Sequence, residues 1–129
     1  MRRGASLLAL LLIATGGCAA TPRYDKADCQ TYTEIGLVRV NPAGALDRHF
    51  SLEAVFKVCP PDEGLEEIQR KRIELLNNLL SLLSSKSEEE LKDPLRAEKL
   101  RSEILLMANE KVLKRGRVID VFITSMELE

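Results

Sequence analysis

Few residues in this 129-residue chain are of a type that performs covalent or metal chemistry. They are three cysteines, Cys18, Cys29 and Cys59, and a single histidine, His49. No set of cysteine, aspartate and serine accompanies His49, and the sequence has no C-x-x-C, H-E-x-x-H, G-x-S-x-G or glycine-rich phosphate motif. We therefore expect no catalytic residues, no metal ligands and no cofactor, and we interpret His49 as a structural or solvent-exposed residue.

Cys18 ends a segment that is typical of exported proteins. The opening residues, MRRGASLLALLLIATGGCAA, combine a basic start, an apolar run and small residues before the cysteine. This order is typical of a secretory signal. Small residues directly followed by cysteine resemble the bacterial lipobox, in which a diacylglycerol is attached to the cysteine sulfur and the signal is cut just before it. We predict a lipoprotein signal peptide over residues 1–17 and lipidation at Cys18.

Two alternatives remain for this segment: a retained anchor helix, or a cleaved signal in which Cys18 is structural. The uncharged run Ala5–Ala20 is shorter than the roughly 20 residues that a membrane-spanning helix needs, which favours the lipoprotein. Two acyl chains would anchor the protein stably, because binding by a single chain is marginal. Ala19 rather than aspartate follows the cysteine, which usually permits transfer to the outer membrane. We expect the protein on the periplasmic side of a bacterial membrane, with the outer membrane favoured over the inner.

Cys29 and Cys59 form an even pair, which in an exported protein indicates a disulfide. If the strands on either side of residues 41–48 form a hairpin, Cys59 lies opposite residue 31, two positions from Cys29. A slight bend would then bring the two Cα atoms within the roughly 4.4–6.8 Å that a disulfide requires. We predict a Cys29–Cys59 bridge. The alternative is two free thiols, one of them in an exposed tether.

The pattern of apolar residues predicts three strands. Residues 18–32 are polar and are interpreted as a lipidated tether, so the domain is expected over residues 33–129. The first strand is predicted at 33–40, and the second at 49–58, where apolar and polar residues alternate. The last strand is predicted from Val118, Ile119, Val121, Phe122 and Ile123, which are too apolar and β-branched for a surface loop. They predict a central strand that is covered on both faces.

Helices are predicted between the second and third strands. One is expected over residues 62–84, with Pro61 and acidic residues at its start. Ser87 and Glu90 form a capping box that opens a short turn of helix. The last helix is expected from Asp93 to Arg115, with Gly116 as the residue that ends it. This order of elements predicts the α+β class: a small antiparallel or mixed sheet packed with two long helices.

The charged runs favour structural interpretations. The net charge of −1 and the absence of tryptophan give no indication of nucleic-acid binding. The acidic run Glu88–Glu90 is interpreted as a helix cap rather than a cation site. Gln69–Arg72 and Lys114–Arg117 are interpreted as solvated helix faces, with contact to lipid phosphates or an acidic partner as the alternative. The leucines of Leu75–Leu83 are expected in the core, and any that reach the surface are expected in an oligomer contact.

A longer stretch carries a resemblance. LLSLLSSKSEEELKDPLRAEKLRSEILLMANEKVLKRGRVIDVFITSMELE resembles the C-terminal half of the flagellar basal-body-associated FliL family, and IGLVRVNPAG followed by HFSLEAVF resembles its start. The resemblance covers most of Thr33 to Glu129. It implies a periplasmic domain similar to the stomatin-type (SPFH) fold, whose copies assemble side by side around or beside the stator units of the motor. Family members ordinarily carry a transmembrane helix, whereas this chain has a short signal and Cys18.

We therefore expect a non-catalytic, lipid-anchored flagellar protein that serves motility. Its expected partners are further copies of itself, flagellar stator or basal-body proteins, and the membrane through its lipid. No nucleic acid is expected. The alternative is an envelope lipoprotein that acts as a binding or scaffold module unrelated to the flagellum. An enzyme is a third hypothesis, for which no nucleophile and base can be named.

Overall fold

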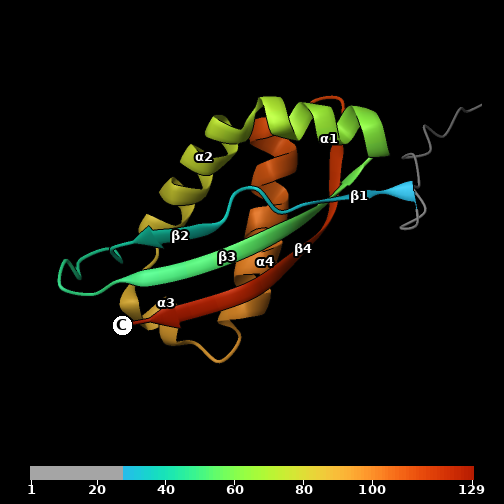
Figure 1. The fold of residues 1–129 in the computed structure, drawn as a ribbon. Coiled ribbons are helices and arrows are strands. Elements are labelled where there is room, and N and C mark those ends of the chain that lie inside the picture. Colours follow the sequence, from blue (N-terminus) through green and yellow to red (C-terminus); the bar gives the residue numbers. More distant parts are fainter. Residues whose placement is uncertain (1–27) are drawn as a thin grey trace, which may run out of the picture.

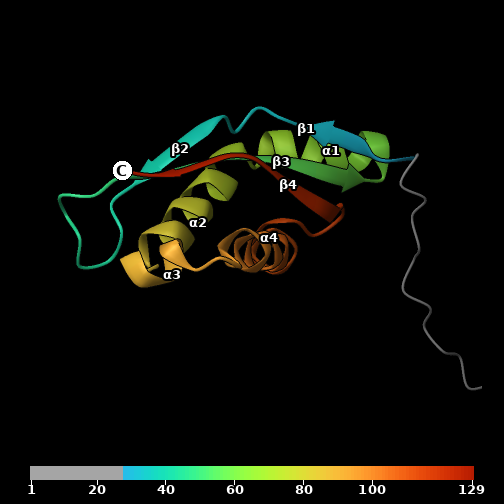
Figure 2. The same ribbon diagram turned by 90° about the horizontal axis from the view of Figure 1, so that it is seen from below.

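The computed structural model describes residues 28–129, which form a four-stranded sheet with helices packed against one of its faces (Figures 1 and 2). The predicted α+β class is confirmed. The elements in chain order are β1 (Gln30–Tyr32), β2 (Leu37–Val40), β3 (Phe50–Cys59), α1 (Pro61–Arg70), α2 (Arg72–Ser84), α3 (Glu88–Lys92), α4 (Arg96–Met107), the π-helical turn η2 (Ala108–Val112) and β4 (Arg117–Leu128).

β3 is the central strand of the sheet, and its pairing with all three other strands is antiparallel. β4 pairs with β3 from Cys59 to Phe50 and so occupies one edge of β3 along its whole length. β1 and β2 pair with the two ends of β3 and share its other edge. Val40 lies opposite Phe50 in the β2–β3 pairing, so this hairpin closes where the sequence predicts.

The first predicted strand, 33–40, is interrupted. Gly36 has a φ of +72°, in the left-handed region that glycine enters without strain, and β2 begins only at Leu37. Upstream, Gln30–Tyr32 form β1 although the sequence analysis assigned them to the tether, and Tyr32 is buried. The ordered part of the domain therefore begins earlier than residue 33.

The last strand departs from its predicted place. The sequence analysis expected residues 118–123 in a central strand covered on both faces. Instead, β4 pairs only with β3 among the described residues, and only Val118 and Val121 in it are buried. Phe122 is 45% exposed because it pairs with Val55, between the inward-facing Ala54 and Phe56 of β3, and therefore lies on the opposite face of the sheet. No described helix covers that face (Figure 2). The apolar residues of β4 are thus divided between the helix-covered face and the uncovered face, so a nearly continuous apolar run did not require cover on both faces.

The two predicted long helices are each divided. The first breaks at Lys71 into α1 and α2, which run in different directions (Figure 1). The second becomes α4 and the π-helical turn η2, and the chain is extended from Leu113 onward rather than helical to Arg115. Ser87 caps α3 as predicted, since its side chain accepts a hydrogen bond from Glu90 N–H.

Gly116 is not the left-handed helix-ending residue that the sequence analysis expected, because its φ is not positive. Its lack of a side chain serves a close contact between chain segments. A Cβ atom at Gly116 would lie 2.7 Å from the Cα of Gly64, too close for the backbone of α1 to remain in place. Glycine at 116 therefore lets the segment before β4 pass directly against α1.

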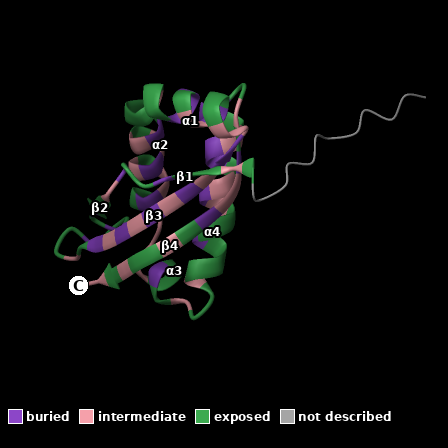
Figure 3. Cartoon of the chain, turned by 45° about the vertical axis from the view of Figure 1, so that its right-hand side comes forward, coloured by how far each residue is buried: buried purple, intermediate pink, exposed green. Residues whose placement is uncertain are grey.

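The core lies between the sheet and the helices (Figure 3). It contains the inward-facing residues of β3 together with one row of leucines from α2 and apolar residues of α4. Leu75, Leu79 and Leu83, spaced four apart, are fully buried, and each contributes about 1.5–3 kcal/mol. Leu76, Leu80 and Leu82 pack against this row but stay partly exposed. The leucines of α2 are thus mainly core, as predicted, although the helix is fully buried on one side only.

Candidate functional site

The side chains singled out for possible catalysis do not form a site. Residues 28–129 contain no group of three or more His, Cys, Asp or Glu side chains that could hold a metal ion. His49 is exposed just before β3, and its backbone exchanges two hydrogen bonds with that of Glu129, of 3.0 and 2.8 Å. Its Nδ1 lies 3.4 Å from the side-chain nitrogen of Asn41. His49 thus extends the pairing of β3 and β4 by one position.

Cys29 and Cys59 form a disulfide in the structure, with Cα atoms 4.6 Å apart. The β1–β3 register places Gln30 opposite Val58, so the next pair outward is Cys29 opposite Cys59. The hairpin predicted from the sequence put Cys59 opposite residue 31, two positions from Cys29, because residues 33–40 were expected to form one continuous strand. In the structure, residues 33–36 of the first segment stand opposite only residues 54–55 of β3. The additional residues shift the register of β1, so that Cys29 lies directly opposite Cys59. Cys18 and the predicted signal lie outside the described residues, so lipidation remains a prediction.

The most polar site in the interior is built around Glu67, which the sequence analysis did not single out. Glu67 lies on α1 and is only 2% exposed. Its carboxylate accepts hydrogen bonds from the backbone N–H groups of residues 114–116, of which Gly116 N–H to Oε1, at 2.7 Å, is the shortest. Lys71 Nζ donates to the same carboxylate at 3.2 Å and to the carbonyl of Val112 at 2.9 Å. One side chain thereby fastens α1 to the segment that connects η2 with β4.

The electrostatics of Glu67 follow from these donors. Burial by itself would raise the pKa of Glu67, because it disfavours the charged carboxylate. The backbone donors at Gly116 and Lys114, the Lys71 ammonium and the backbone donor at Arg115 outweigh burial and lower the pKa from 4.5 to about 2. Glu67 is therefore ionised at neutral pH. Within α1, Glu67 stands three positions after Gly64 and next to Ile68, both of which are buried, and this helical spacing is a sequence signal that could have indicated its burial.

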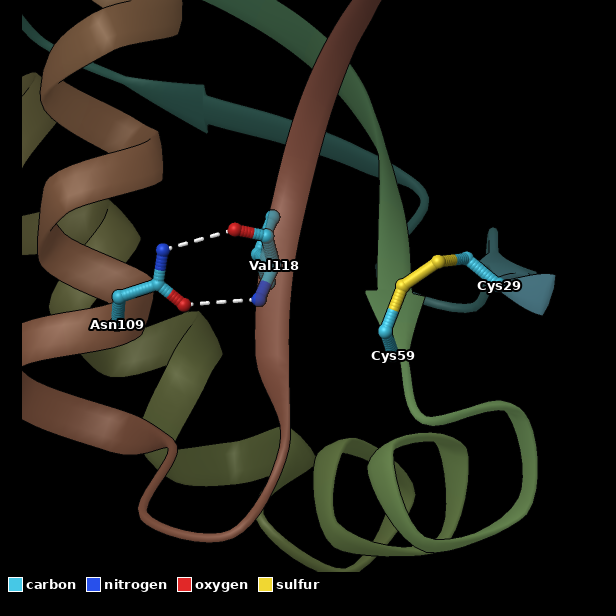
Figure 4. The surroundings of a disulfide bond; sticks show 4 residues. All are labelled: Cys29, Cys59, Asn109 and Val118. Carbon is cyan, nitrogen blue, oxygen red and sulfur yellow. Dashed lines mark hydrogen bonds between the residues drawn. A yellow bond between two sulfur atoms is a disulfide. The ribbon is translucent and has the colours of Figure 1, made fainter. Parts of the chain in front are cut away.

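Asn109 performs a similar task at the outer edge of β4 (Figure 4). Its side-chain nitrogen donates to the carbonyl of Val118 and its side-chain oxygen accepts from Val118 N–H, both at 2.8 Å. An amide side chain with one donor and one acceptor thus replaces a neighbouring strand at this position. Figure 4 shows Asn109, β4, β3 and the disulfide in this order across the sheet. Capping an exposed edge in this way hinders unwanted strand pairing there.

The charged runs have mixed roles. Glu88 forms ion pairs with Arg48, at 2.7 Å, and with Lys92, at 2.8 Å, and these partners lower its pKa. In the run Gln69–Arg72, Lys71 is largely buried against Glu67, so the prediction of a fully solvated face is wrong for this residue. In Lys114–Arg117, backbone N–H groups rather than basic side chains make the described contacts with Glu67.

A groove of about 250 Å³ lies where α4 passes the free edge of β4. Its lining comes from the first half of α4 and the middle of β4: Ala97, Glu98, Arg101, Val121, Phe122 and Ile123. Most of the lining is apolar, and Phe122 forms the side toward the open face of the sheet. A second depression between α3 and α4 is lined mainly by charged residues, several of which pair with one another, as Lys86 does with Glu103 and Lys99 with Asp93. The groove beside β4 is therefore the better candidate for binding an apolar group.

The loop between β2 and β3, residues 41–49, is fixed by many polar contacts. The Asn41 side chain donates to the carbonyls of Leu46, at 3.1 Å, and Arg48, at 2.8 Å. The Ala43 N–H donates at 2.8 Å to a backbone carbonyl just before α3, and Arg48 pairs with Glu88 of α3. Leu46 is nevertheless 87% exposed. The loop thus holds an apolar side chain in solvent on an ordered backbone.

Comparison with known proteins gives one family. The model of the family described as flagellar basal body-associated protein FliL matches residues 32–127, well over half of the chain. No curated protein matches the sequence. Within the described residues, no helix is long and apolar enough to span a bilayer.

Proposed function

Because the chain belongs to the flagellar basal body-associated FliL family, we propose that it is a non-catalytic protein that assembles at the basal body and supports the stator units for motility. The observation that carries this proposal is the family match over residues 32–127, which includes the whole sheet except the start of β1 and the last residue of β4. A lack of catalytic groups fits a structural component but adds no independent support. We also propose that the domain has a stomatin-type fold, with which its α+β architecture is compatible.

The proposed anchor is a lipid on Cys18. Residues 1–17 would be removed as a signal, and the part of the predicted tether 18–32 that precedes β1 would connect the domain to the periplasmic face of a membrane. The supports are the apolar opening segment with small residues before Cys18 and the disulfide at the point where the described chain begins. A lipid anchor at this point would let the domain approach flagellar proteins from the membrane surface, with the outer membrane favoured by Ala19.

Lateral assembly of several copies is the second part of the proposal. Within residues 28–129, β4 has a free edge over most of its length, and no helix covers one face of the sheet (Figure 2). Leu37, 63% exposed, and Phe122 lie on that face. Copies tethered to one membrane are confined to a thin layer, which raises their effective concentration and so favours weak lateral contacts.

The test is deletion of the gene, followed by complementation. We expect the deletion strain to swim more slowly, most clearly in viscous medium, and to retain fewer stator units under load. The wild-type gene should restore both properties. If swimming speed, torque under load and stator retention all stay unchanged without the gene, the flagellar role is wrong.

The alternative is an envelope lipoprotein that serves as a scaffold apart from the flagellum. The lipobox-like segment favours it, because it stands where the family ordinarily has a transmembrane helix. A fluorescent fusion separates the two hypotheses. Foci that coincide with labelled flagellar hooks support the first, and an even distribution around the cell, unchanged in a strain without flagella, supports the alternative.

A further inference from the structure

Leu46 is held outward by an unusually well-fixed loop. Single exposed leucines are common on protein surfaces and by themselves indicate nothing. Here, however, the Asn41 side chain donates to the backbone carbonyls of Leu46 itself and of Arg48, and the Arg48 side chain ties the loop to α3. Binding through such a loop loses little conformational entropy, since the loop is already ordered. Leu46 is therefore presented as a preformed apolar projection.

The groove beside β4 has the matching properties. Its lining is mostly apolar and includes Ala97, Val121 and Phe122, so it offers apolar surface to an inserted side chain. Arg101 lies at its rim, and within residues 28–129 no ion pair or hydrogen bond of the Arg101 side chain is found. Asp47, next to Leu46, likewise has no ion pair among the described residues. An apolar projection beside a free carboxylate thus matches an apolar groove beside a free guanidinium.

The projection and the groove cannot meet within one molecule. Figure 1 shows the loop between β2 and β3 extending past one end of the sheet, while α4 crosses the middle of β4. We propose that Leu46 of one copy inserts into the groove between α4 and β4 of the next copy, and that Asp47 of the first pairs with Arg101 of the second. The occupant of the groove is thus a second copy of this chain.

This interface is heterologous, because two different surfaces of the chain meet in it. Each bound copy leaves one loop and one groove free, so the contact adds further copies in one direction. The inference rests on the self-assembly in the proposed function and specifies its contact. Glu98 also lines the groove and would repel Asp47 if the two were adjacent. The pairing therefore depends on Arg101, not on a generally basic rim.

Cysteine cross-linking tests the interface in the full-length protein on membranes. Leu46→Cys and Ala97→Cys are made in separate, differently tagged copies, and the native Cys29–Cys59 bridge remains. Mild oxidation should link the two variants only when they are co-expressed, and a chain that carries both substitutions should give a ladder of multimers. Leu46→Cys that links to itself as readily as to Ala97→Cys would overturn the proposal. So would the absence of any link between the two variants.

Charge reversal provides a second measurement. Arg101→Asp places like charges together and should reduce the cross-linked yield roughly tenfold, the effect of about 1.4 kcal/mol. Adding Asp47→Arg to the same chain should restore most of the yield. Arg117→Asp, which alters an exposed arginine outside the groove, is the matched control and should leave the yield unchanged. The Asp47–Arg101 pair would be contradicted if Arg101→Asp and Arg117→Asp reduced the cross-linked yield equally. It would also be contradicted if Asp47→Arg did not restore the yield of Arg101→Asp.

The outcomes separate this interface from the flagellar role. If the cysteine variants do not link while gene deletion still impairs motility, the interface is wrong and the flagellar function stands. If they link as expected while deletion has no effect on motility, the interface stands and the flagellar function is wrong. The melting temperature of each variant is measured to show that it is folded.

Discussion

Glu67 shows how one buried side chain joins distant parts of this chain. Its carboxylate receives backbone N–H groups from residues 114–116, nearly fifty positions away in the sequence, and an ammonium from Lys71. Hydrogen bonds to a charged group contribute more than neutral ones, and an unpaired buried donor costs about 1–3 kcal/mol. Glu67 is therefore the main polar link between α1 and the start of β4.

The first prediction concerns the acid stability of this link. The pKa of Glu67 is about 2 in the folded protein and 4.5 in the unfolded reference. A lowered folded pKa gives stability that is complete above pH 4.5 and is lost as pH falls toward 2. The shift corresponds to about 3 kcal/mol. Glu67→Gln should lower the free energy of unfolding at pH 7 by about 2–3 kcal/mol. Between pH 5 and 2, the free energy of unfolding of the variant should lack the decrease that protonation of Glu67 causes in the wild type.

Urea denaturation at a series of pH values measures both effects. Glu66→Gln is the matched control, because Glu66 is the exposed neighbour on the same helix and its substitution should change little. The link between α1 and the start of β4 would be shown not to matter if Glu67→Gln and Glu66→Gln gave the same stability at pH 7.

At the scale of elements, β1 depends on the disulfide. It is only three residues long, pairs with one end of β3, and is separated from β2 by residues 33–36. Tyr32 is its only buried residue. A short edge strand with so few contacts would fray readily without an additional constraint. The Cys29–Cys59 bridge supplies that constraint at the point where the proposed tether enters the domain.

The second prediction is that loss of this bridge acts mainly on β1. The two cysteines are 30 positions apart, for which loop-closure entropy gives about 3–4 kcal/mol. The double variant Cys29→Ala/Cys59→Ala should lose about this much unfolding free energy and should exchange the amide hydrogens of Thr31 and Tyr32 much faster. Hydrogen exchange measured by mass spectrometry, together with urea denaturation, reports both changes.

Reduction provides the control for that variant. Wild-type protein treated with a dithiol should behave like the double variant, whereas the double variant should not respond to the dithiol. Amide protection in α4 and the β3–β4 pairing should stay close to wild type under mild conditions. Undiminished protection of β1 after reduction would mean that the pairing with β3 holds this strand without the bridge.

At the scale of the whole molecule, the arrangement is two-layered and one-sided. Among the described residues, α2, α3 and α4 lie on one face of the sheet, no helix lies on the other face, and residue 28 lies near the end of the sheet that carries the disulfide (Figures 2 and 4). A tether that leaves from this end lets the domain turn its bare sheet face or its β4 edge toward neighbours. The proposed membrane attachment would thus determine which surfaces are available for assembly.

The third prediction tests that attachment. Cys18→Ser removes the proposed lipidation site, so the protein should appear as unprocessed precursor or be released from the membrane fraction. Cell fractionation and labelling with a radioactive fatty acid measure this. Cys29→Ser is the matched control, which should stay lipidated and membrane-bound although its disulfide is lost. Continued lipid labelling of the Cys18→Ser protein would refute Cys18 as the modified residue.

Sequence reasoning was most successful where local rules act. The alternation over 49–58 gave β3, the Ser87–Glu90 spacing gave the cap of α3, and the residues around 41–49 gave the hairpin. It failed where long-range contacts override local preference. Residues 118–123 look like a buried central strand, yet the number of strands and the position of β3 leave β4 at an edge. The helix break at Lys71 has no local breaker; it coincides with the contacts of Lys71 to Glu67 and Val112.

The sequence by itself determined the family, the α+β class, the apolar face of β3 and the pairing partner of each domain cysteine. The α+β class and the apolar face of β3 follow from periodicity over a few neighbouring positions. The family follows from the ordered motifs that resemble it along most of residues 33–129, and the cysteine pairing from the even pair and the expected hairpin. Only the tertiary structure decided that Glu67 would be buried, that Asn109 would cap the edge of β4 and that Cys29 would lie directly opposite Cys59. Each of these depends on how segments far apart in the chain come together, which the spacing of neighbouring residues does not specify.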